Sequence, residues 1–581
     1  MLSLSTVDVI PNNTLVRFTG MVQDMFNPEY YVSEYQDRGS GAWVTTRWGD
    51  GFVEGSLGCE VEKRFDERIP VLIVPVPGMS GWVVDGMEAA AKASVAQFGG
   101  GRGGGQVSKG KRGLDVEMAR VEEEEEKEKE KEEEEEEEEE ESGGAKDADA
   151  ITSTDAVVAK KSVTFGDVHM EGDGDGKTTI GANNNQDALD IPRGSCVVHL
   201  YGNTATMKLN EVVEVFGVIS RVPELASGAM HGLTMEEEGA AASMVPTSVA
   251  PRVHAILQRK VGATGMAGVI DEDGPAGTGT GRAPVLEPAT RERIVGFLKQ
   301  CLRGDALAAE YVLMHLVSRA AQRSQGGGAT AGQETQLPTP SLNITGVDNS
   351  FSAALWEALS QLVPSVVHLP LEIEALNRKP WYPVKVNERV NGSAVLQLPA
   401  GAVLVLDETA MRTGELTDTG LKNLGAIQTM MQSQKLPYDF QFYQLEQPTD
   451  QPIFIASAGR TMLKGAGEIQ VPLTEEKAPI SSSSPVSPVS PVAFEGDIEA
   501  ARRYLAEARS MAFSIPKELV KHLEHDMIEA SKDRDVNAET FHRWMNLSRL
   551  LCCSHGEGEL SLDRWRQMLS MEAERLGRIS R

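Results

Sequence analysis

Near its start the chain alternates apolar and polar residues in short runs that turn residues separate. Alternation with a period of two is typical of strands that bury one face. The runs are TLVRFTGMVQDM from Thr14, EYYVSEYQD from Glu29, GAWVTTRW from Gly41 and RIPVLIVPVPG from Arg68. About four strands of this kind would leave a sheet edge open, so this β domain is incomplete by Val84.

The strands that could complete it follow a long insertion. Residues 86–190 are small, glycine-rich and charged, and we interpret them as one disordered insertion. Strand patterns resume with CVVHLY from Cys196 and LNEVVEVFGVISRV from Leu209. The simplest arrangement is a small barrel of the oligonucleotide/oligosaccharide-binding (OB) type, split by the insertion into residues 1–85 and 191–262.

A Gly/Ala-rich linker over 263–285 leads to a region of mixed pattern over 286–473. Residues 290–323 show helical periodicity, with His315 expected as a packed residue. The elements predicted after it are a strand at Leu342–Thr345, a helix at Phe351–Leu362, a strand in Gly401–Met411, a helix at Gly420–Gln434 and a strand at Gln451–Ala456, with Ser457 at a position where related ATPases carry a polar sensor. This order predicts a doubly wound α/β domain.

The apolar strand GAVLVLDETAM ends on the carboxylate pair Asp407 and Glu408. In P-loop ATPases an acidic strand end of this kind lies beside Mg²⁺ and the attacking water. A buried parallel strand whose end is acidic by chance is the alternative interpretation. An upstream phosphate loop, G-x-x-x-x-G-K-[ST] between a strand and a helix, distinguishes the two.

That loop lacks the required residues. Aligned on Gly346, the chain places Phe351 where the second Gly belongs and Ser352 where Lys belongs, and Asp348 adds a negative charge. We therefore expect a degenerate ATPase-like core of the AAA+ type that kept the fold and lost the phosphate loop. We assign no catalytic, cofactor-binding or metal-binding residue and expect no enzyme activity and no cofactor.

Other candidate motifs are incomplete. Gly176-Lys177-Thr178 resembles half a phosphate loop but has neither a strand before it nor a helix after it. Trp82 breaks the nucleophile-elbow pattern that begins at Gly78. Cys552, Cys553 and His555 lack a second ligand pair at zinc spacing.

The chain ends in a Ser/Pro linker and a helical region. The linker, 474–496, contains Ser-Pro pairs at Ser484, Ser487 and Ser490, which suit either a stiff spacer or proline-directed phosphorylation. Residues 497–581 are predicted to be helical throughout, with Asn537 or Thr540 as possible caps. This region resembles the helical lid that follows an ATPase core.

Charge and composition limit the function further. The 581 residues carry a net charge of −30, and 17 Glu with 3 Lys lie between Glu122 and Glu141. This run is typical of a disordered spacer or of a segment that attracts basic partners electrostatically. The five cysteines show no paired spacing, so we expect a reducing compartment. The sequence shows no secretory leader and no apolar run of about 18 residues, so we expect a soluble, non-secreted protein without membrane contact.

Single-strand nucleic acid is one partner that an OB barrel could bind. Bases stack on aromatic side chains in a basic groove. The nearby aromatic and basic residues are Tyr30, Tyr31, Tyr35, Trp43, Trp48, Arg17, Arg38 and Arg47. Residues 1–98 nevertheless hold 13 acidic and 7 basic side chains, a net of −6, which disfavours direct nucleic-acid binding.

Several separated segments together resemble the minichromosome maintenance (MCM) complex-binding protein family. They are NTLVRFTGMVQDMFNPEYYV from Asn13, KLNEVVEVFGVIS from Lys208, APRVHAIL from Ala250, LRGDALAAEYVLMHLVS from Leu302, LQLPAGAVLVLDET from Leu396 and GLKNLGAIQTMMQSQKLPYDF from Gly420. The resemblance covers nearly all of the chain outside the acidic insertion, and it carries over no contact residues.

The resemblance implies a nuclear, non-catalytic partner of the MCM helicase subunits that acts in helicase assembly or unloading, in DNA replication and in sister-chromatid cohesion. A weak basic cluster, Lys109-Gly110-Lys111-Arg112, is compatible with nuclear import. Two other hypotheses stay open on the residues alone. They are a single-strand-binding adaptor that uses the barrel and an unconventional ATPase that uses Asp407 and Glu408.

Overall fold

We analysed a computed structural model of the chain. The residues that the structure describes are 10–37, 40–49, 62–88, 191–202, 207–221, 245–261, 286–319, 321–323, 335–337, 340–386, 389–390, 393–463, 469–474, 492–533 and 538–580. All of them belong to one compact unit, Met1–Glu88 with Thr164–Arg581. The acidic run, the GKT motif, the basic cluster, Cys59 and the Ser-Pro pairs lie outside these residues.

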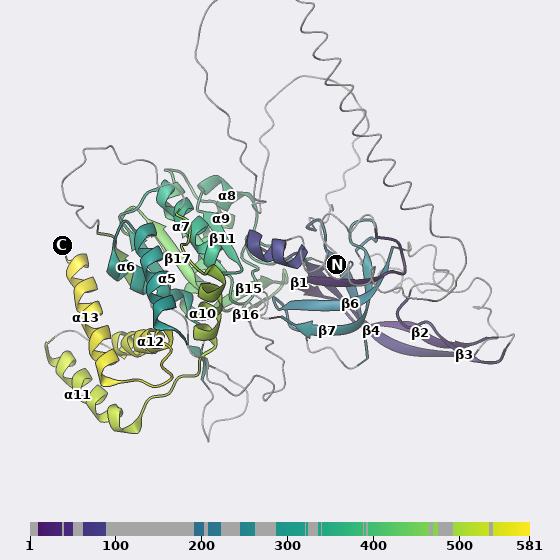
Figure 1. The fold of residues 1–581 in the computed structure, drawn as a ribbon. Helices are drawn as coiled ribbons and strands as arrows, with labels where there is room; N and C mark the ends of the chain where they lie inside the picture. Colours follow the sequence, from purple (N-terminus) through teal and green to yellow (C-terminus); the bar gives the residue numbers. More distant parts are fainter. Residues whose placement is uncertain are drawn as a thin grey trace, which may run out of the picture. The chain divides into compact units, whose positions relative to one another are not determined.

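The first described module is a sheet whose strands come from both sides of the insertion (Figure 1). Its strands are β1 (Leu15–Met25), β2 (Glu29–Gln36), β3 (Trp43–Thr45), β4 (Lys63–Val74), β5 (Cys196–Tyr201), β6 (Val212–Ser220) and β7 (Arg252–Lys260). The six strands predicted from alternation are therefore confirmed. Strand β7 was not predicted as a strand.

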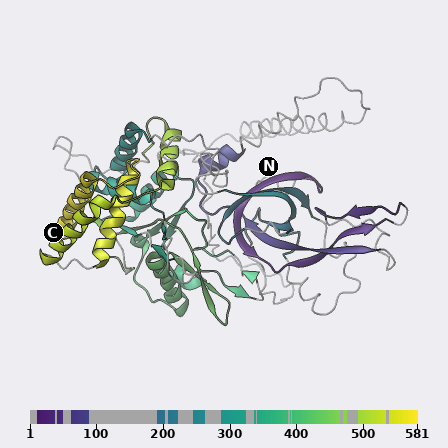
Figure 2. The same cartoon turned by 90° about the horizontal axis from the view of Figure 1, so that it is seen from below.

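This sheet closes on itself. Its order is β1-β6-β7-β5-β4, and β4 pairs again with β1, so five strands form a closed ring (Figure 2). The pair β5 and β7 is parallel, and the other neighbours in the ring are antiparallel. The prediction that β5 and β6 alone would complete the sheet is wrong, because these two strands meet only through β7. Inward side chains such as Val16, Val198 and Val215 fill the interior.

Strands β2 and β3 extend the sheet beyond the ring. They continue from β4, with Tyr30 opposite Glu67 and Gln36 opposite Trp43. Because neighbours across a ladder share a face, one face of this extension carries Tyr30, Val32 and Phe65. The other face carries arginines and carboxylates that pair with each other, as described below.

The second module is built on a five-stranded parallel sheet with the order β11-β14-β17-β10-β18. These strands are β10 (Leu342–Thr345), β11 (Val366–Pro370), β14 (Val403–Asp407), β17 (Ile453–Ser457) and β18 (Ile469–Pro472). The predicted strands at 342–345, within 401–411 and at 451–456 are confirmed. Parallel strands need crossover connections, which here are largely helical.

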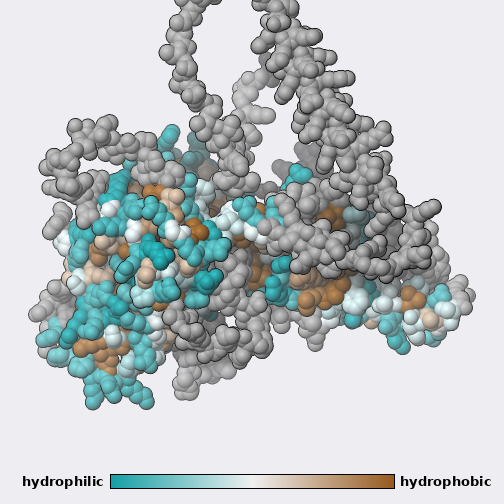
Figure 3. Space-filling model, viewed as in Figure 1, coloured by the Kyte–Doolittle hydropathy of each residue, from teal (hydrophilic) through white to brown (hydrophobic). Residues whose placement is uncertain are grey.

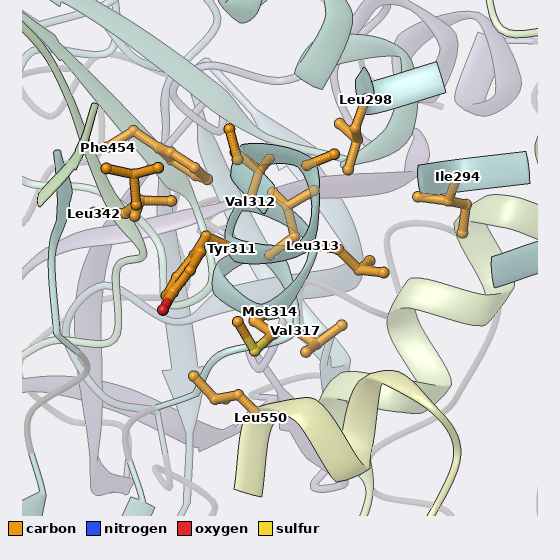
Figure 4. Packing of buried hydrophobic residues seen from close by; sticks show 14 of the residues in the cluster. Ile294, Leu298, Tyr311, Val312, Leu313, Met314, Val317, Leu342, Phe454 and Leu550 are labelled. Carbon is orange, nitrogen blue, oxygen red and sulfur yellow. The ribbon is translucent and has the colours of Figure 1, made fainter. Parts of the chain in front are cut away.

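Helices cover both faces of this sheet, as a doubly wound domain requires. They are α5 (Pro288–Cys301), α6 (Ala306–Leu316), α7 (Asn349–Leu362), α8 (Ile373–Arg378) and α9 (Asp418–Ser433). In β14 Val403 and Val405 face the cluster formed with α5, α6 and α7, whereas Leu404 and Leu406 face α8 and α9. Figure 4 shows the first cluster, in which Tyr311 and Val312 of α6 lie near Leu342 and Phe454 of the sheet.

The single helical run expected over 290–323 is divided. Arg303 and Gly304 have φ values of 55° and 87°, which end α5 in the left-handed region. Asp305 then caps α6 by accepting a hydrogen bond from the Ala308 N–H at 3.0 Å. Residues 321–323 form a strand, β8 (Ala321–Arg323), paired with β9 (Thr335–Leu337).

The C-terminal region is helical, as predicted, but it consists of separate helices. They are α10 (Ile498–Ser510), α11 (Lys517–Asp533), α12 (Ala538–Ser554) and α13 (Leu562–Ile579). Thr540 lies inside α12 and is not its cap, and Asn537 lies outside the described residues. Their outer surface is mostly hydrophilic, with a small hydrophobic group over α11 (Figure 3). Buried Trp544 and Trp565 join the same core as α5 and α6.

Short strands complete the second module. They are β12 (Lys385–Val386) with β13 (Arg389–Val390), and the hairpin of β15 (Lys435–Asp439) with β16 (Gln444–Pro448). A one-turn helix, η2 (Glu408–Ala410), follows β14. Of the helices that the structure describes, none combines the length and the apolar character needed to cross a membrane.

Buried polar contacts join the two modules. The Lys385 ammonium lies 2.7 Å from the Asp24 carboxylate, and the Gln397 amide donates to the Gln23 carbonyl at 2.8 Å. The Tyr438 hydroxyl donates to the Asn210 side chain at 3.1 Å. A buried donor or acceptor that loses its partner is costly, so these contacts favour a fixed arrangement of the two modules.

Candidate functional site

The loop between β10 and α7 occupies the place of the expected phosphate cradle. Only Gly346, Val347 and Asp348 separate the strand from the helix. Gly346 has a φ of 82°, a left-handed conformation that glycine adopts without a steric penalty. The chain therefore turns into α7 after only three residues.

Asp348 caps the N-terminus of α7 from within the chain. Its carboxylate accepts hydrogen bonds from the Phe351 N–H at 2.9 Å and from the Ser350 hydroxyl at 2.7 Å. The hydrogen bond from Ser350 is the main reason that the pKa of Asp348 lies below its usual value. A helix N-terminus attracts anions through its free N–H groups and its dipole. Here the chain's own carboxylate already occupies that position.

The two residues that replace the motif's Gly and Lys both point into the protein. Phe351 is buried, and the guanidinium of Arg303 lies 5.7 Å from its ring centroid. Ser352 is buried as well, with its hydroxyl 3.0 Å from Nε2 of His368. Neither side chain offers a positive charge to a phosphate.

Asp407, at the end of β14, is fully buried. Its Oδ1 accepts hydrogen bonds from the Thr409 N–H at 2.9 Å and the Thr409 hydroxyl at 2.5 Å, and its Oδ2 lies 3.5 Å from Nε2 of His368. Burial opposes ionisation of Asp407, but the contacts with His368 and Thr409 outweigh it and hold the pKa of Asp407 below its usual value. The carboxylate is therefore stabilised by protein groups.

Ser352, His368 and Asp407 together resemble the composition of a catalytic triad, but their geometry differs. In a triad one ring nitrogen of histidine contacts serine and the other contacts aspartate. Here Nε2 of His368 makes both contacts. The indole ring of Trp356 stacks on His368, with centroids 6.2 Å apart. The cluster is thus a packed polar group between α7, the middle of β11 and the carboxyl end of β14, and it has no relay geometry.

Glu408, the second carboxylate of the pair, turns toward the segment after β17. It accepts hydrogen bonds from the Thr461 hydroxyl and from the Leu463 N–H, the latter at 3.3 Å. At the expected sensor position the Ser457 hydroxyl contacts Oδ1 of Asn343 at 2.9 Å, and both residues are buried. The acidic pair therefore diverges, and each member is engaged by neighbouring protein groups.

The aromatic residues considered for nucleic-acid stacking lie mostly on β2 and β3. Tyr30, Trp43 and Trp48 are exposed, whereas Tyr35 is buried. The arginines beside them are paired with carboxylates. These pairs are Arg64 with Glu34 at 2.8 Å, Arg47 with Asp66 at 3.0 Å, Arg68 with Glu29, and Arg17 with Glu214. Arg38 lies outside the described residues. The paired guanidinium groups leave little positive charge for phosphates.

The other candidate motifs have structural roles. The Ser80 hydroxyl is buried and donates to the Val363 carbonyl at 2.7 Å. Cys552 and Cys553 are buried in α12, and burial raises the pKa of Cys552 to about 12. Within the described ranges, no group of three or more His, Cys, Asp or Glu residues is placed to hold a metal ion.

Sequence reasoning missed His368 and the hairpin of β15 and β16. The apolar run Val-Val-His-Leu-Pro from Val366 was the available signal for β11, because it is a short buried strand pattern bounded by turn residues. The hairpin's signal was the loop Asp439-Phe-Gln-Phe-Tyr443, a cluster of aromatic residues between two short alternating runs.

The fold and the site define a two-module protein, a closed β-barrel joined to a parallel α/β domain, whose candidate nucleotide site is filled by the chain's own side chains. The model of the family described as Mini-chromosome maintenance replisome factor matches residues 1–579, and the chain belongs to this family. The resemblance inferred from the sequence is therefore confirmed.

Relatives are similar over almost their whole length. A mini-chromosome maintenance complex-binding protein of Arabidopsis thaliana is 28% identical over 607 residues, covering 100% of this chain and 90% of the relative. The proteins of the same name from Danio rerio and Homo sapiens are 27% and 25% identical. Alignment with the Danio rerio protein covers 97% of this chain and 88% of the relative, and alignment with the human protein covers 98% and 89%.

Proposed function

We propose that this chain is a nuclear, non-catalytic binding partner of the MCM helicase subunits. It acts in the assembly or unloading of the helicase complex, and thereby in DNA replication and sister-chromatid cohesion. Membership of the family and the name shared by its relatives support the MCM complex as the partner. The observation that supports a non-catalytic role is the internal capping of α7 by Asp348, where an ATPase would hold phosphate.

The strand orders support a relationship to helicase subunits. Numbered along the chain, the five strands of the barrel follow the order 1-2-3-5-4 with a parallel pair between the third and the fifth, as in OB folds. The five strands of the α/β sheet follow the order 2-3-4-1-5, which AAA+ ATPases share. An OB barrel followed by such a core and a helical lid has the outline of a helicase subunit.

The proposed mechanism is structural mimicry. The barrel or the α/β module docks where a helicase subunit would otherwise lie, and the chain holds this interface without ATP turnover. Because Asp407 and Glu408 are engaged by Thr409, His368 and Thr461, nucleotide would have to displace internal contacts in order to bind.

Binding measurements on the purified chain test this function. Recombinant MCM subunits immobilised on a sensor should bind the chain with the same affinity with and without ATP and Mg²⁺, and calorimetry of the chain alone with ATP and Mg²⁺ should give no heat of binding. Absence of any MCM binding contradicts the proposal. Nucleotide binding in the micromolar range, about −8 kcal/mol, supports the unconventional ATPase instead.

The single-strand-binding alternative rests on the exposure of Tyr30, Trp43 and Trp48. It predicts that a fluorescent oligonucleotide binds with an affinity that falls steeply as salt rises. Because Arg47, Arg64 and Arg68 are paired with carboxylates, we expect no such binding at physiological salt.

A further inference from the structure

The hairpin of β15 and β16 combines a buried base with an exposed tip. Its strands pair from Lys435 opposite Pro448 to Asp439 opposite Gln444. At the base Leu436 and Tyr438 are buried in the core of the α/β module. At and beyond the tip Phe442 is 93% exposed, Tyr443 56% and Leu445 45%. Three large apolar side chains therefore gather on one short projection.

The tip is an ordered turn. Asp439 accepts a hydrogen bond from the Gln441 N–H at 2.9 Å, and the Phe440 N–H donates to the Tyr443 carbonyl at 2.9 Å. The rings of Phe440 and Tyr443 stack with their centroids 4.8 Å apart and their planes 7° apart. Gln441 takes a φ of 67°, the left-handed conformation that such a turn needs.

The first strand of the hairpin is fixed to the rest of the protein near its tip. The Asp439 N–H donates to the Pro383 carbonyl at 2.9 Å, and the Tyr438 hydroxyl reaches Asn210 of the barrel. Phe442 is thus presented by a rigid support. Pre-organised aromatic side chains of this kind are typical anchors in protein interfaces, since little freedom is lost when they bind.

The charge around the tip indicates the chemistry of a partner. From residue 436 to residue 459 the chain has three acidic residues, Asp439, Glu446 and Asp450, and no Lys or Arg. Lys435 pairs with Glu446 at 3.0 Å and Arg509 pairs with Asp450 at 3.1 Å, so two of the three carboxylates are balanced within the chain. The whole chain nevertheless carries a net charge of −30. A surface that accepts this tip is therefore favoured if its rim is basic.

We infer that this hairpin is a docking element that inserts Phe442 into an apolar pocket with a basic rim on an MCM subunit. The inference rests on the proposed function and assigns its contact. Phe442 is the anchor of the interface, Tyr443 and Leu445 cover the pocket's edge, and a basic residue of the rim takes the place of Lys435 beside the Glu446 carboxylate.

Binding kinetics of full-length variants on immobilised MCM subunits test the anchor. Phe442→Ala removes an exposed ring from outside the core, so the thermal unfolding midpoint should not change, while the affinity should fall by about 10-fold or more. Leu421→Ala is the matched control, since Leu421 is 57% exposed on α9 of the same module and lies outside the hairpin. Its affinity should stay within about 2-fold of the wild type.

The basic rim has its own test. Glu446→Lys should slow association at low salt, whereas Glu415→Lys, an equal charge change at an exposed residue before α9, should not. Unchanged association of Glu446→Lys overturns the basic rim.

The outcomes separate the two proposals. Wild-type affinity of Phe442→Ala overturns the docking inference and leaves the proposed function in place. Failure of the wild-type chain to bind any MCM subunit overturns both. If Phe442→Ala instead abolishes self-association and leaves MCM binding unchanged, the occupant is a second copy of this chain and the inference is wrong.

Discussion

At the scale of single residues, His315 illustrates how burial decides the role of a titratable group. It lies in α6 with its ring packed edge-on against Phe454, centroids 4.5 Å apart, and its Nε2 is 3.0 Å from the Ile453 carbonyl. The sequence predicted a packed helix residue, and this is confirmed. Burial disfavours the charged imidazolium and lowers the pKa of His315 to about 3.

This pKa predicts an acid sensitivity. The unfolded chain protonates His315 near its ordinary pKa of about 6.5, whereas the folded protein keeps it neutral down to about 3. The unfolded state therefore binds more protons between these values, and stability falls as the pH falls below 6.5. His315→Gln, which keeps a donor for Ile453, should remove up to roughly 2 kcal/mol of the stability difference between pH 7 and pH 5.

Urea unfolding at the two pH values, followed by tryptophan fluorescence, measures this difference. His542→Gln is the control, because His542 is exposed on α12. Equal pH dependence of His315→Gln and the wild type would show that His315 is not protonated on unfolding in this range.

At the scale of elements, the segment after β4 connects the barrel to β11, an edge strand of the parallel sheet. The Val366 N–H donates to the Gly78 carbonyl at 2.8 Å, and the Ser80 N–H donates to the Pro364 carbonyl at 2.9 Å. Gly78 has a φ of 66°, and a Cβ there would lie 2.5 Å from Cγ2 of Val367 and 2.9 Å from the Val366 carbonyl oxygen. Only glycine fits this approach without displacing β11.

Gly78→Ala should therefore destabilise the protein by about 2–4 kcal/mol, because it adds a steric clash with backbone to the cost of a left-handed alanine. Gly202→Ala is a matched control with a φ of 76° and open space around the new Cβ, and it should cost only about 1–2 kcal/mol. Differential scanning calorimetry compares the two. Equal losses would contradict the tight packing of Gly78 on β11.

Elements with a strong period were predictable from the sequence, and elements that depend on distant contacts were not. The strands at 15–25 and 342–345 and the helix over 418–433 were found because each alternates or repeats within its own residues. Strand β7 was missed because it does not alternate: the exposed apolar residues Ile256 and Leu257 are adjacent, and the polar residues Gln258, Arg259 and Lys260 follow them. Its pairing with β5 and β6 makes it a strand.

The residues that depart from the phosphate-loop motif could be identified from the sequence, but their contacts in the structure could not. The substitutions at Phe351 and Ser352 can be read from spacing against the phosphate-loop motif. The contact of His368 with both Ser352 and Asp407 joins three separate elements, α7, β11 and β14, so no local pattern indicates it. The break at Gly304 was likewise hidden, because apolar periodicity continues across it.

At the scale of the whole molecule, the C-terminal helices are tied to the α/β module by buried charge. Glu572 of α13 accepts hydrogen bonds from Arg575 at 2.7 Å and from the Tyr311 hydroxyl of α6 at 2.5 Å, and Arg575 reaches the Gln470 carbonyl of β18. Arg578 pairs with Asp305 at 2.6 Å. These contacts connect α13 to α6 and to β18, so the C-terminal helices pack as part of the α/β module.

Because Asp407 and Glu408 are held by contacts within the protein, we predict that substituting them does not change the affinity for MCM subunits. Asp407→Asn keeps an oxygen for the two Thr409 donors, and Glu408→Gln keeps an acceptor for Thr461, so both variants should fold. In a working P-loop ATPase, losing either carboxylate would impair Mg²⁺ binding or activation of water. Here we expect MCM affinity within about 2-fold of the wild type for both variants, with and without ATP.

Binding of the chain to MCM subunits on a sensor, with ATP hydrolysis by the chain alone measured in parallel, distinguishes a non-catalytic binding partner from an ATPase. If the chain is a non-catalytic binding partner, ATP should change neither the affinity nor the kinetics of wild-type binding to MCM subunits. If ATP strengthened wild-type binding and Asp407→Asn removed that gain, the carboxylates would have to exchange Thr409 and His368 for Mg²⁺ in the complex. The internally capped α7 opposes this exchange, because the Asp348 carboxylate at the N-terminus of that helix would repel the incoming phosphates.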